Sequence, residues 1–251
     1  MLSATARTHR AAPDEFRDRV VLITGAGDGI GRAVALACAR HGATVVLLGR
    51  TQSKLETVYD EILATGGARP AIVPLDLASA DGPVYFKLAE QIGTTWGRLD
   101  GLLHNAGTLG KLSPIEHYDI GLWHQVMHLN LNVPFILTQV MIPLLRKSAD
   151  ASVVFASSGV GRHGRAFWGA YAASKFGIEG LSQTLADELE TDGRIRVNCI
   201  NPGGTRTRMR AAAYPGEDPA SRPDPASLTA SYLWLLGPAS KGATGQSLDC
   251  Q

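Results

Sequence analysis

The chain has 251 residues, of which 45% are hydrophobic and 19% are charged, and its formal net charge is +1. This length and composition suit one large domain with a substantial core and exclude a disordered chain. The near-neutral charge gives no reason to expect a nucleic-acid or membrane partner, and no apolar run is seen to reach the roughly 18 residues that span a bilayer.

The cysteines and the first residues indicate the cellular setting. Cys38, Cys199 and Cys250 lack the spacing of metal ligands and are interpreted as reduced, mostly buried thiols of a cytoplasmic protein. We expect residues 1–16 to be a short disordered tail, with a transit peptide as the less favoured alternative. Residues 17–251 are expected to form a single domain.

A strand is predicted at residues 20–24, and the glycine-rich loop Gly25-Ala-Gly-Asp-Gly-Ile-Gly31 follows it directly. A helical pattern comes next, at residues 33–40. Glycines between a strand and a helix let the backbone approach a pyrophosphate, and the helix N-terminus supplies free N–H groups. We therefore predict a dinucleotide site here, with a glycine-rich turn that binds nothing as the alternative.

The second predicted strand, residues 44–48, ends at Gly49 and is followed by Arg50. In a site for NAD, an acidic side chain about 20 residues beyond the glycines binds the ribose hydroxyls. No acid occurs here before Glu56, whereas the guanidinium of Arg50 suits the 2′-phosphate of NADP(H). We predict NADP(H) as the preferred cofactor, with NAD(H), or a solvated Arg50 without a ligand, as alternatives.

Strands and helices then alternate regularly along the chain. Further strands are predicted at residues 71–75, 101–104, 151–155, 194–200 and 246–249, and helices at residues 53–65, 83–96, 121–146, 171–190 and 226–236. This pattern predicts an α/β fold, a single-domain Rossmann-type doubly wound parallel sheet of about seven strands with helices on both faces. Asn105, Ser158 and Pro202 follow strand ends, where ligands bind in such sheets.

The predicted helix at residues 121–146 carries two features that bear on function. His124 and His128 have a spacing that can bind zinc, but Gln125 stands where a metalloprotease has its Glu, so we expect no metal. Pro134 has no N–H to bond the carbonyl of Asn130. A kink there would leave that carbonyl free to hold a water.

The chemistry is assigned to Tyr171-Ala-Ala-Ser-Lys175. On a helix, Tyr171 and Lys175 lie on one face about one turn apart, so the ammonium is expected to lower the pKa of the phenol towards working pH. Ser158 follows the strand at residues 151–155, and its hydroxyl can bind the oxygen that Tyr171 protonates. The pair alone is a weak signal, and the rest of the chain supports it.

Residues 205–225 are rich in Arg, Ala and Pro without clean periodicity, and we interpret them as a mobile substrate loop or lid. Arg206, Arg208 and Arg210 are candidates to attract an anionic substrate, although such runs are more often solvated. Candidates for an apolar substrate pocket, with ordinary packing as the alternative, are Phe167, Trp168, Met209 and Tyr214.

Taken together, these motifs resemble the short-chain dehydrogenase/reductase family over nearly the whole chain. The matching positions, in order, are Thr24-Gly25-x-x-x-Gly29-Ile30-Gly31, Asp76, Asn105-Ala106-Gly107, Asn130, Ser158, Tyr171-x-x-x-Lys175 and Pro202-Gly203. Longer stretches such as LITGAGDGIGR and RVNCINPGGTRTRMRA look like the bacterial YciK-like branch of this family. The resemblance implies a homotetramer or homodimer, with the helices at residues 121–146 and 171–190 at a two-fold interface.

The resemblance also implies a role for each matching residue. Tyr171 is the general acid or base, and Lys175 lowers its pKa and binds the nicotinamide ribose. Ser158 orients the carbonyl, and Asn130 holds a water linked to Lys175. The implied cofactor contacts, besides Tyr171 and Lys175, are Gly25, Asp28, Gly29, Ile30, Gly31, Arg50, Asp76, Leu77, Asn105, Ala106, Gly107, Pro202, Gly203, Thr205 and Thr207.

Two positions depart from the family pattern. His104 stands where many members have an Asn, and little functional change is expected because Asn105 is retained. Asp28 stands where some NADP-using members carry a basic residue, which leaves Arg50 to support the preference for NADP(H).

We therefore predict an NADP(H)-dependent oxidoreductase that interconverts a small-molecule carbonyl and an alcohol by hydride transfer. Alternatives are an NAD(H)-dependent alcohol dehydrogenase of the same family and a non-catalytic dinucleotide-binding or sensing protein. The non-catalytic protein is less favoured because all four catalytic positions, Asn130, Ser158, Tyr171 and Lys175, are filled. An epimerase or dehydratase with the same Tyr–Lys pair is disfavoured because those enzymes usually carry a longer substrate domain.

Overall fold

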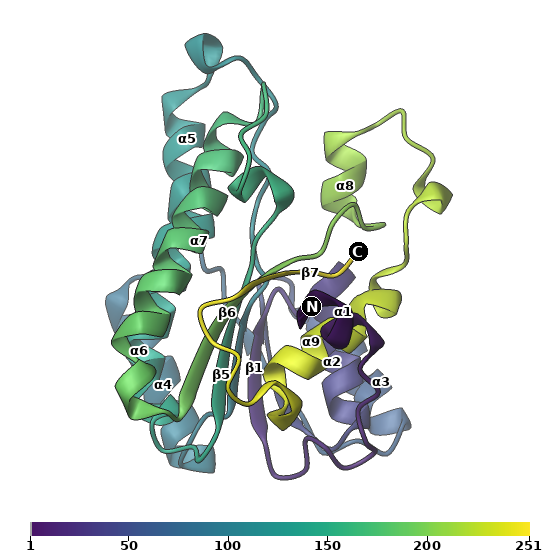
Figure 1. The fold of residues 1–251 in the computed structure, drawn as a ribbon, viewed down its shortest axis with the longest axis vertical. Coiled ribbons are helices and arrows are strands. Elements are labelled where there is room, and N and C mark those ends of the chain that lie inside the picture. The colour runs from purple at the N-terminus through teal and green to yellow at the C-terminus, as the bar shows by residue number, and fades with distance from the viewer. Residues whose placement is uncertain (1) are drawn as a thin grey trace.

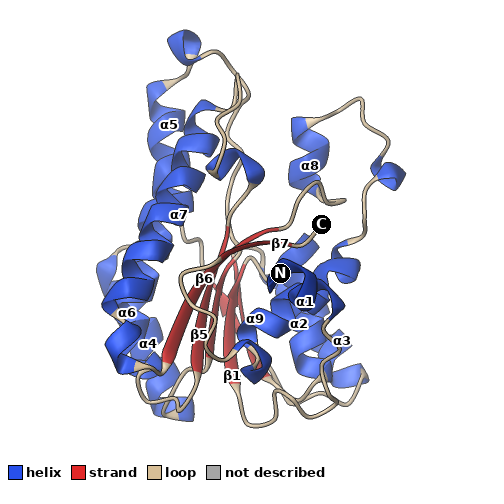
Figure 2. Ribbon diagram, viewed as in Figure 1, coloured by secondary structure: helices blue, strands red, loops and turns tan. Residues whose placement is uncertain are grey.

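A seven-stranded parallel sheet forms the centre of the computed structural model, which describes residues 2–251 (Figure 2). The strand order is β3-β2-β1-β4-β5-β6-β7, and every neighbouring pair is parallel. The strands are β1 (Val20–Thr24), β2 (Thr44–Gly49), β3 (Ala71–Pro74), β4 (Gly101–His104), β5 (Ala151–Ala156), β6 (Ile195–Asn201) and β7 (Ser247–Asp249). The doubly wound parallel sheet predicted from the sequence is confirmed.

Helices cover both faces of the sheet and give a three-layered molecule (Figure 1). One face packs against α2 (Gly29–Arg40), α3 (Gln52–Ala64) and α9 (Thr229–Leu236). The other packs against α4 (Gly82–Trp96), α6 (Val133–Leu145) and α7 (Gly169–Glu188). Because both faces are buried, the strands are continuous apolar runs, and β1 is buried at all five positions.

The chain order of the strands places a cleft at the carboxyl end of β1. After β1 the chain builds β2 and β3 on one side, then crosses back and builds β4 on the other side of β1. The connections that leave β1 and β4 therefore diverge. In open parallel sheets this switch point is where ligands bind.

The expectation of a disordered tail at residues 1–16 is wrong for the described part, which begins at Leu2. Residues Leu2–Thr8 form α1, which packs against α9 with Ala6 fully buried. The hydroxyl of Ser3 accepts a hydrogen bond from the N–H of Asp249 at 3.1 Å. Phe16 is also fully buried. The segment is ordered because its few apolar side chains complete a core built by distant parts of the chain.

The single helix predicted at residues 121–146 is three consecutive pieces. α5 (Ile120–Met127) passes into a π-helical turn, His128–Asn132, and then into α6, whose first turn contains Pro134. In the π turn an N–H bonds the carbonyl five residues back, as Val133 does to His128. This wider turn accommodates the missing N–H of Pro134. A free carbonyl on Asn130 remains a prediction.

The same run, Ile120–Leu145, is the one helix in the described chain that is long and apolar enough to cross a membrane, with 26 residues and a mean hydropathy of 1.3. Half of its most apolar window is buried inside the fold. Leu137 and Met141 are fully buried against the sheet. A helix that packs in the core of a globular domain passes the same test, so this is weak evidence for a membrane segment.

The predicted loop at residues 205–225 contains a short helix, α8 (Arg208–Ala213), and a single 3₁₀ turn, Pro219–Ser221. The side chain of Thr207 caps α8 by accepting from the N–H of Arg210 at 3.2 Å. Figure 1 shows α8 standing across from α5 and α7, beyond the carboxyl ends of the strands. The segment is therefore partly helical and lies at the edge of the sheet where a ligand is expected.

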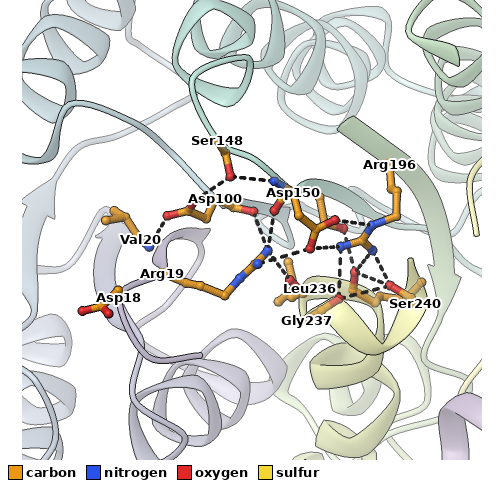
Figure 3. A network of polar contacts seen from close by, with 12 residues as sticks. Asp18, Arg19, Val20, Asp100, Ser148, Asp150, Arg196, Leu236, Gly237 and Ser240 are labelled. Atoms are coloured by element: carbon orange, nitrogen blue, oxygen red, sulfur yellow. Dashed lines mark hydrogen bonds and ion pairs between the residues drawn. The ribbon is translucent and has the colours of Figure 1, made fainter. Parts of the chain in front are cut away.

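An ion-pair network holds the opposite, amino ends of the strands (Figure 3). Arg19, Asp100 and Asp150 directly precede β1, β4 and β5, and Arg196 lies in β6. Asp150 binds both guanidinium groups, with Oδ2 3.2 Å from Nη1 of Arg19 and Oδ1 3.1 Å from Nε of Arg196. Asp100 accepts from the N–H of Val20 at 2.8 Å. These contacts fix the strand ends that are remote from the cleft.

Candidate active site

A groove runs across the carboxyl ends of the strands. It consists of two adjoining cavities of about 380 and 240 Å³, which share Gly25, Asp28, Ala106 and Gly107. Other predicted cofactor residues line the first cavity, Arg50, Asp76 and Leu77. The second is lined by Gly29, Ile30, Asn105, Tyr171, Lys175, Pro202 and Thr207. The fold thus brings residues that follow six of the strands, β1 to β6, into one elongated cleft.

The glycine loop forms the floor where the two cavities meet. Gly25 has a φ of +68°, a left-handed conformation that favours glycine. A Cβ on Gly31 would lie 2.3 Å from the carbonyl oxygen of Gly25, so Gly31 allows helix α2 to pack closely on the loop. Gly31 itself does not line either cavity. Gly29 and Ile30, the first residues of α2, line the groove, and the N–H of Gly29 donates to the carboxylate of Asp28 at 2.8 Å. The N-terminus of a helix has the positive potential that an anion site requires.

Thr24 and Asn105 fix the loop after β4 against the end of β1. The hydroxyl of Thr24 accepts from the N–H groups of Asn105 and Ala106, each at 3.0 Å. The amide of Asn105 donates to the carbonyl of Thr24 at 3.2 Å. The amide side chain is therefore occupied in shaping the groove wall. His104, the departure at the preceding position, is buried and contacts the hydroxyl of Thr138 at 2.7 Å.

One end of the groove carries a guanidinium that no carboxylate of the described chain neutralises. Arg50 and Lys54 both line it, and within residues 2–251 Arg50 has no ion-pair partner. Lys54, which sequence reasoning missed, donates to Asp28 at 2.5 Å, and Arg208 lies 3.2 Å from the same carboxylate. These contacts lower the pKa of Asp28, chiefly through the hydrogen bond from Lys54. The negative charge of Asp28 is thus offset by Lys54 and Arg208, and Arg50 remains available to bind an anion.

Tyr171 and Lys175 lie at the other end of the groove, on the buried side of α7. The ammonium of Lys175 donates to the carbonyl of Ala156 at 2.6 Å and lies 5.6 Å from the centroid of the Tyr171 ring. Ser158 follows β5 and hydrogen-bonds to Tyr171. Ser158 and Tyr171 also line a smaller adjoining cavity. The three side chains predicted to carry the chemistry are therefore together.

The expectation that Lys175 lowers the pKa of Tyr171 is wrong for this structure. Burial raises the pKa of Tyr171 to about 12, and only the hydrogen bond from Ser158 opposes this shift. Burial also lowers the pKa of Lys175 to about 8. The phenol is taken out of water, which disfavours its anion. At neutral pH Tyr171 is a protonated phenol and thus a proton donor.

Asn130 lies in the π turn, is 1% exposed and does not line the groove. Its Oδ1 accepts from the N–H of Thr108 at 2.8 Å, and its Nδ2 donates to the carbonyl of Thr108 at 2.9 Å and to the hydroxyl of Ser174 at 3.1 Å. A Cβ on Gly107 would lie 3.1 Å from Asn130 Oδ1 and 4.0 Å from Lys175 Nζ. The side chain therefore holds the loop that lies against Lys175.

The smaller cavity next to Ser158 and Tyr171 is lined by the remaining predicted residues of this end. These are Pro202, Gly203, Thr205 and Thr207, together with Trp168 and Met209. Tyr214 lies behind Trp168, with ring centroids 6.0 Å apart, and does not line the cavity. Phe167 is 56% exposed and is not part of the pocket. Two of the four apolar candidates thus form the wall.

The three arginines proposed to attract an anionic substrate are each paired with a carboxylate. Arg206 contacts Asp224 at 2.5 Å, Arg208 contacts Asp28 at 3.2 Å, and Arg210 contacts Glu217 at 2.6 Å. None of them is a free cation in the described structure. As for metals, the part of the chain from Leu2 onward contains no group of three His, Cys, Asp or Glu side chains that could hold an ion.

Comparisons with known proteins show the family of this chain. A family model described as short chain dehydrogenase matches residues 19–218. The uncharacterized oxidoreductase YciK of Escherichia coli K12 is 51% identical over 238 residues, which cover 95% of this chain and 94% of that protein.

Solved structures extend the similarity to the whole fold. A short chain dehydrogenase from Shigella flexneri, crystallised with NADP, superposes with a TM-score of 0.93 at 50% identity, covering 96% of this chain and all of that one. A counterpart from Escherichia coli CFT073, crystallised with NADPH, has a TM-score of 0.93 at 51% identity, covering 96% and 99%.

Proposed function

The chain belongs to the short chain dehydrogenase family of oxidoreductases, and we propose that it interconverts a carbonyl and an alcohol with NADP(H) as its preferred cofactor. The observation that carries this proposal is the groove itself. It joins a free arginine, a glycine loop at a helix N-terminus and the Tyr171–Lys175 pair, in that order, and Ser158 lines the adjoining cavity. Such an order matches the phosphate, pyrophosphate and reacting ends of a phosphorylated dinucleotide.

The groove residues fit that cofactor in chemistry and shape. Arg50 would hold the 2′-phosphate, and Lys54, which is bonded to Asp28, lies at the same end of the groove. Asp76 and Leu77 would contact the adenine, and the loop around Gly29 would bind the pyrophosphate. Pro202 and Thr207 would hold the nicotinamide end, which supplies or accepts a hydride when bound. The relatives crystallised with NADP and NADPH support the phosphorylated form.

The chain's own residues would handle the proton. In carbonyl reduction the phenol of Tyr171 donates its proton to the substrate oxygen, while the hydroxyl of Ser158 orients that oxygen. The ammonium of Lys175 then stabilises the phenolate that is left. With a pKa of about 12, the phenol of Tyr171 carries its proton at neutral pH, which is the form that a proton donor in carbonyl reduction needs. Asn130 would position the loop at Thr108 and a water that links Lys175 to solvent.

Calorimetric titration with NADPH, NADP⁺, NADH and NAD⁺ tests the cofactor proposal. Losing the charge-assisted bonds of one guanidinium costs about 1.5–3 kcal/mol, so Arg50→Ala is expected to weaken NADPH binding by roughly 10- to 100-fold. NADH binding should change little. Arg69→Ala is the matched control, because Arg69 donates to the hydroxyl of Tyr59 and does not line the groove.

Two results of this titration would count against the proposal. Tighter binding of NADH than of NADPH by the wild-type protein would overturn the assignment of Arg50. If none of the four nucleotides binds, the proposed reaction is contradicted, whereas the assignment of the fold is unaffected.

We also propose a cytoplasmic homodimer or homotetramer that associates through α5, α6 and α7. Phe135 on α6 and Phe176 on α7 are 47% and 46% exposed, and Ile120 at the start of α5 is 73% exposed. Large apolar side chains on adjacent helices favour burial against a second copy. Light scattering of the wild-type protein should give at least twice the monomer mass, and Phe176→Glu should lower it. A monomeric wild-type protein at micromolar concentration would contradict the proposal.

A further inference from the structure

The cavity beside Ser158 and Tyr171 is small and largely apolar. Its volume is about 130 Å³, below the roughly 300 Å³ of the smallest pockets that hold drug-sized ligands. Its apolar wall is formed by Leu109, Trp168 and Met209. Among the described residues that line it, Arg210 is the only one with a charged side chain. Whether this pocket accepts an anion therefore depends on Arg210.

The guanidinium of Arg210 is already bonded inside the protein, to a carboxylate that it shares with Arg222. Its Nε donates to Oε2 of Glu217 at 2.6 Å and its Nη2 to Oε1 at 2.7 Å, a bidentate pair. The guanidinium carbon lies 3.7 Å from the centroid of the Tyr214 ring, so one face is covered as well. Hydrogen bonds from Arg210 and Arg222 lower the pKa of Glu217 to about 2, so this carboxylate is ionised at neutral pH. A substrate carboxylate would have to compete with it.

Trp168 is held as a flat wall next to the reacting phenol. Its ring lies 5.7 Å from that of Tyr171 at 61° and 6.0 Å from that of Tyr214. The preceding residue, Phe167, has a φ of +73°, which is strained for a bulky side chain. The carbonyl of Phe167 accepts from the N–H of Ser113 at 3.0 Å, which helps to hold this turn. The strained turn fixes where the indole begins, at the entrance of α7.

We propose that the substrate is a small, neutral carbonyl compound with a flat ring, and that Glu217 excludes carboxylate-bearing analogues by occupying the guanidinium of Arg210. This inference rests on the proposed function. A ring would lie against Trp168 and gain aromatic contact. A carboxylate would lose its hydration in an apolar cavity without a free cation to replace it. Glu217 is thus a specificity-determining residue that acts through Arg210.

The test compares two aldehydes that differ in charge and hardly in shape, 4-nitrobenzaldehyde and 4-carboxybenzaldehyde, with NADPH as the reductant. The wild-type protein is expected to prefer the nitro compound in kcat/KM by roughly tenfold or more. Glu217→Gln keeps the side-chain shape and releases Arg210, so the preference should fall by roughly tenfold. In the double variant Glu217→Gln/Arg210→Met the preference should return.

Two further variants sharpen this comparison. Asp224→Asn is the matched control, because it releases Arg206 in the same segment but Arg206 does not line the cavity. It should leave the preference unchanged. Trp168→Leu is expected to lower kcat/KM for 4-nitrobenzaldehyde roughly fivefold more than for butanal, because it removes only the aromatic wall.

A binding measurement separates this inference from the proposed reaction. The protein saturated with NADP⁺ is titrated with 4-nitrobenzyl alcohol and with 4-(hydroxymethyl)benzoate by calorimetry. Tighter binding of the neutral alcohol by the wild-type protein, with this preference abolished or reversed in Glu217→Gln, supports the pocket assignment. If the same protein reduces no aldehyde, the proposed reaction is overturned and the pocket assignment stands. Equal affinity of the wild-type protein for the neutral and the anionic alcohol, or a preference that Glu217→Gln does not change, overturns the inference whether or not an aldehyde is reduced.

Discussion

Tyr171→Phe is expected to lower the turnover number for carbonyl reduction by roughly 10³-fold, the scale on which a general acid contributes. The substitution removes only the hydroxyl, so the ring keeps its contact with Trp168 at 5.7 Å. Binding of NADPH should therefore stay within about tenfold of the wild-type value. Stopped or steady-state oxidation of NADPH, combined with calorimetry, measures both quantities. Turnover retained within about tenfold would show that another group protonates the substrate.

A matched control and a pH profile separate this role from a structural one. Tyr59→Phe removes a hydroxyl that accepts from Arg69 outside the groove and should leave turnover unchanged. With pKa values of about 8 for Lys175 and about 12 for Tyr171, kcat/KM for reduction should be level below about pH 8 and fall above it. Lys175 loses its proton there and no longer stabilises the phenolate, whereas Tyr171 stays protonated. Lys175→Met should have a low, flat profile, and a wild-type plateau to about pH 10 would contradict the role of Lys175.

The elements that the sequence predicted well are those whose signals are local. The run Val153-Val154-Phe155 is fully buried in β5, as its composition indicates for a strand covered on both faces. The glycine loop after β1 was recognised from its place between a strand and a helix, and Gly25 indeed has a positive φ. Short-range patterns of this kind need no knowledge of distant contacts.

What the sequence could not predict depends on contacts between residues far apart in the chain. The pKa of Tyr171 was predicted in the wrong direction because spacing on a helix reveals the lysine but not the depth of burial. Lys54 was missed because its contact with Asp28 joins residues 26 positions apart. The order of the first residues was missed because Ala6 is buried by α9, near the other end of the chain.

The segment at residues 205–225 has features of both kinds, those that follow from the local sequence and those that depend on distant contacts. Its position near the site follows from its place after β6 and was predicted. Its arginines appeared to be free charges, because the sequence does not show which acid each one meets. Arg210 pairs with Glu217 seven residues later, whereas Arg208 pairs with Asp28 from the glycine loop. In the structure each of the three arginines is bonded to a carboxylate, which supports the alternative that they do not attract an anionic substrate.

Asp150→Ala is expected to lower the free energy of unfolding by about 3 kcal/mol, because it leaves two poorly exposed guanidinium groups without their shared carboxylate. The side chains of Arg19 and Arg196 are 13% and 6% exposed. Arginine does not release its proton in proteins, so the charges remain and must be solvated in place. Several carbonyls still accept from them, including Leu236 from Arg19 at 3.1 Å and Gly237 from Arg196 at 3.0 Å. These contacts limit the loss.

Urea unfolding followed by circular dichroism measures this loss, with Asp14→Ala as the matched control. Asp14 pairs with Arg17 at 2.6 Å, but both side chains are about two-thirds exposed, so its removal should cost much less than that of Asp150. Because the network lies at the amino ends of the strands, kcat per folded Asp150→Ala molecule should equal that of the wild type. Equal stability of the two variants would mean that water already solvates the network. A fall in kcat at full folding would mean that strain at this end of the sheet reaches Tyr171 through β5 and α7.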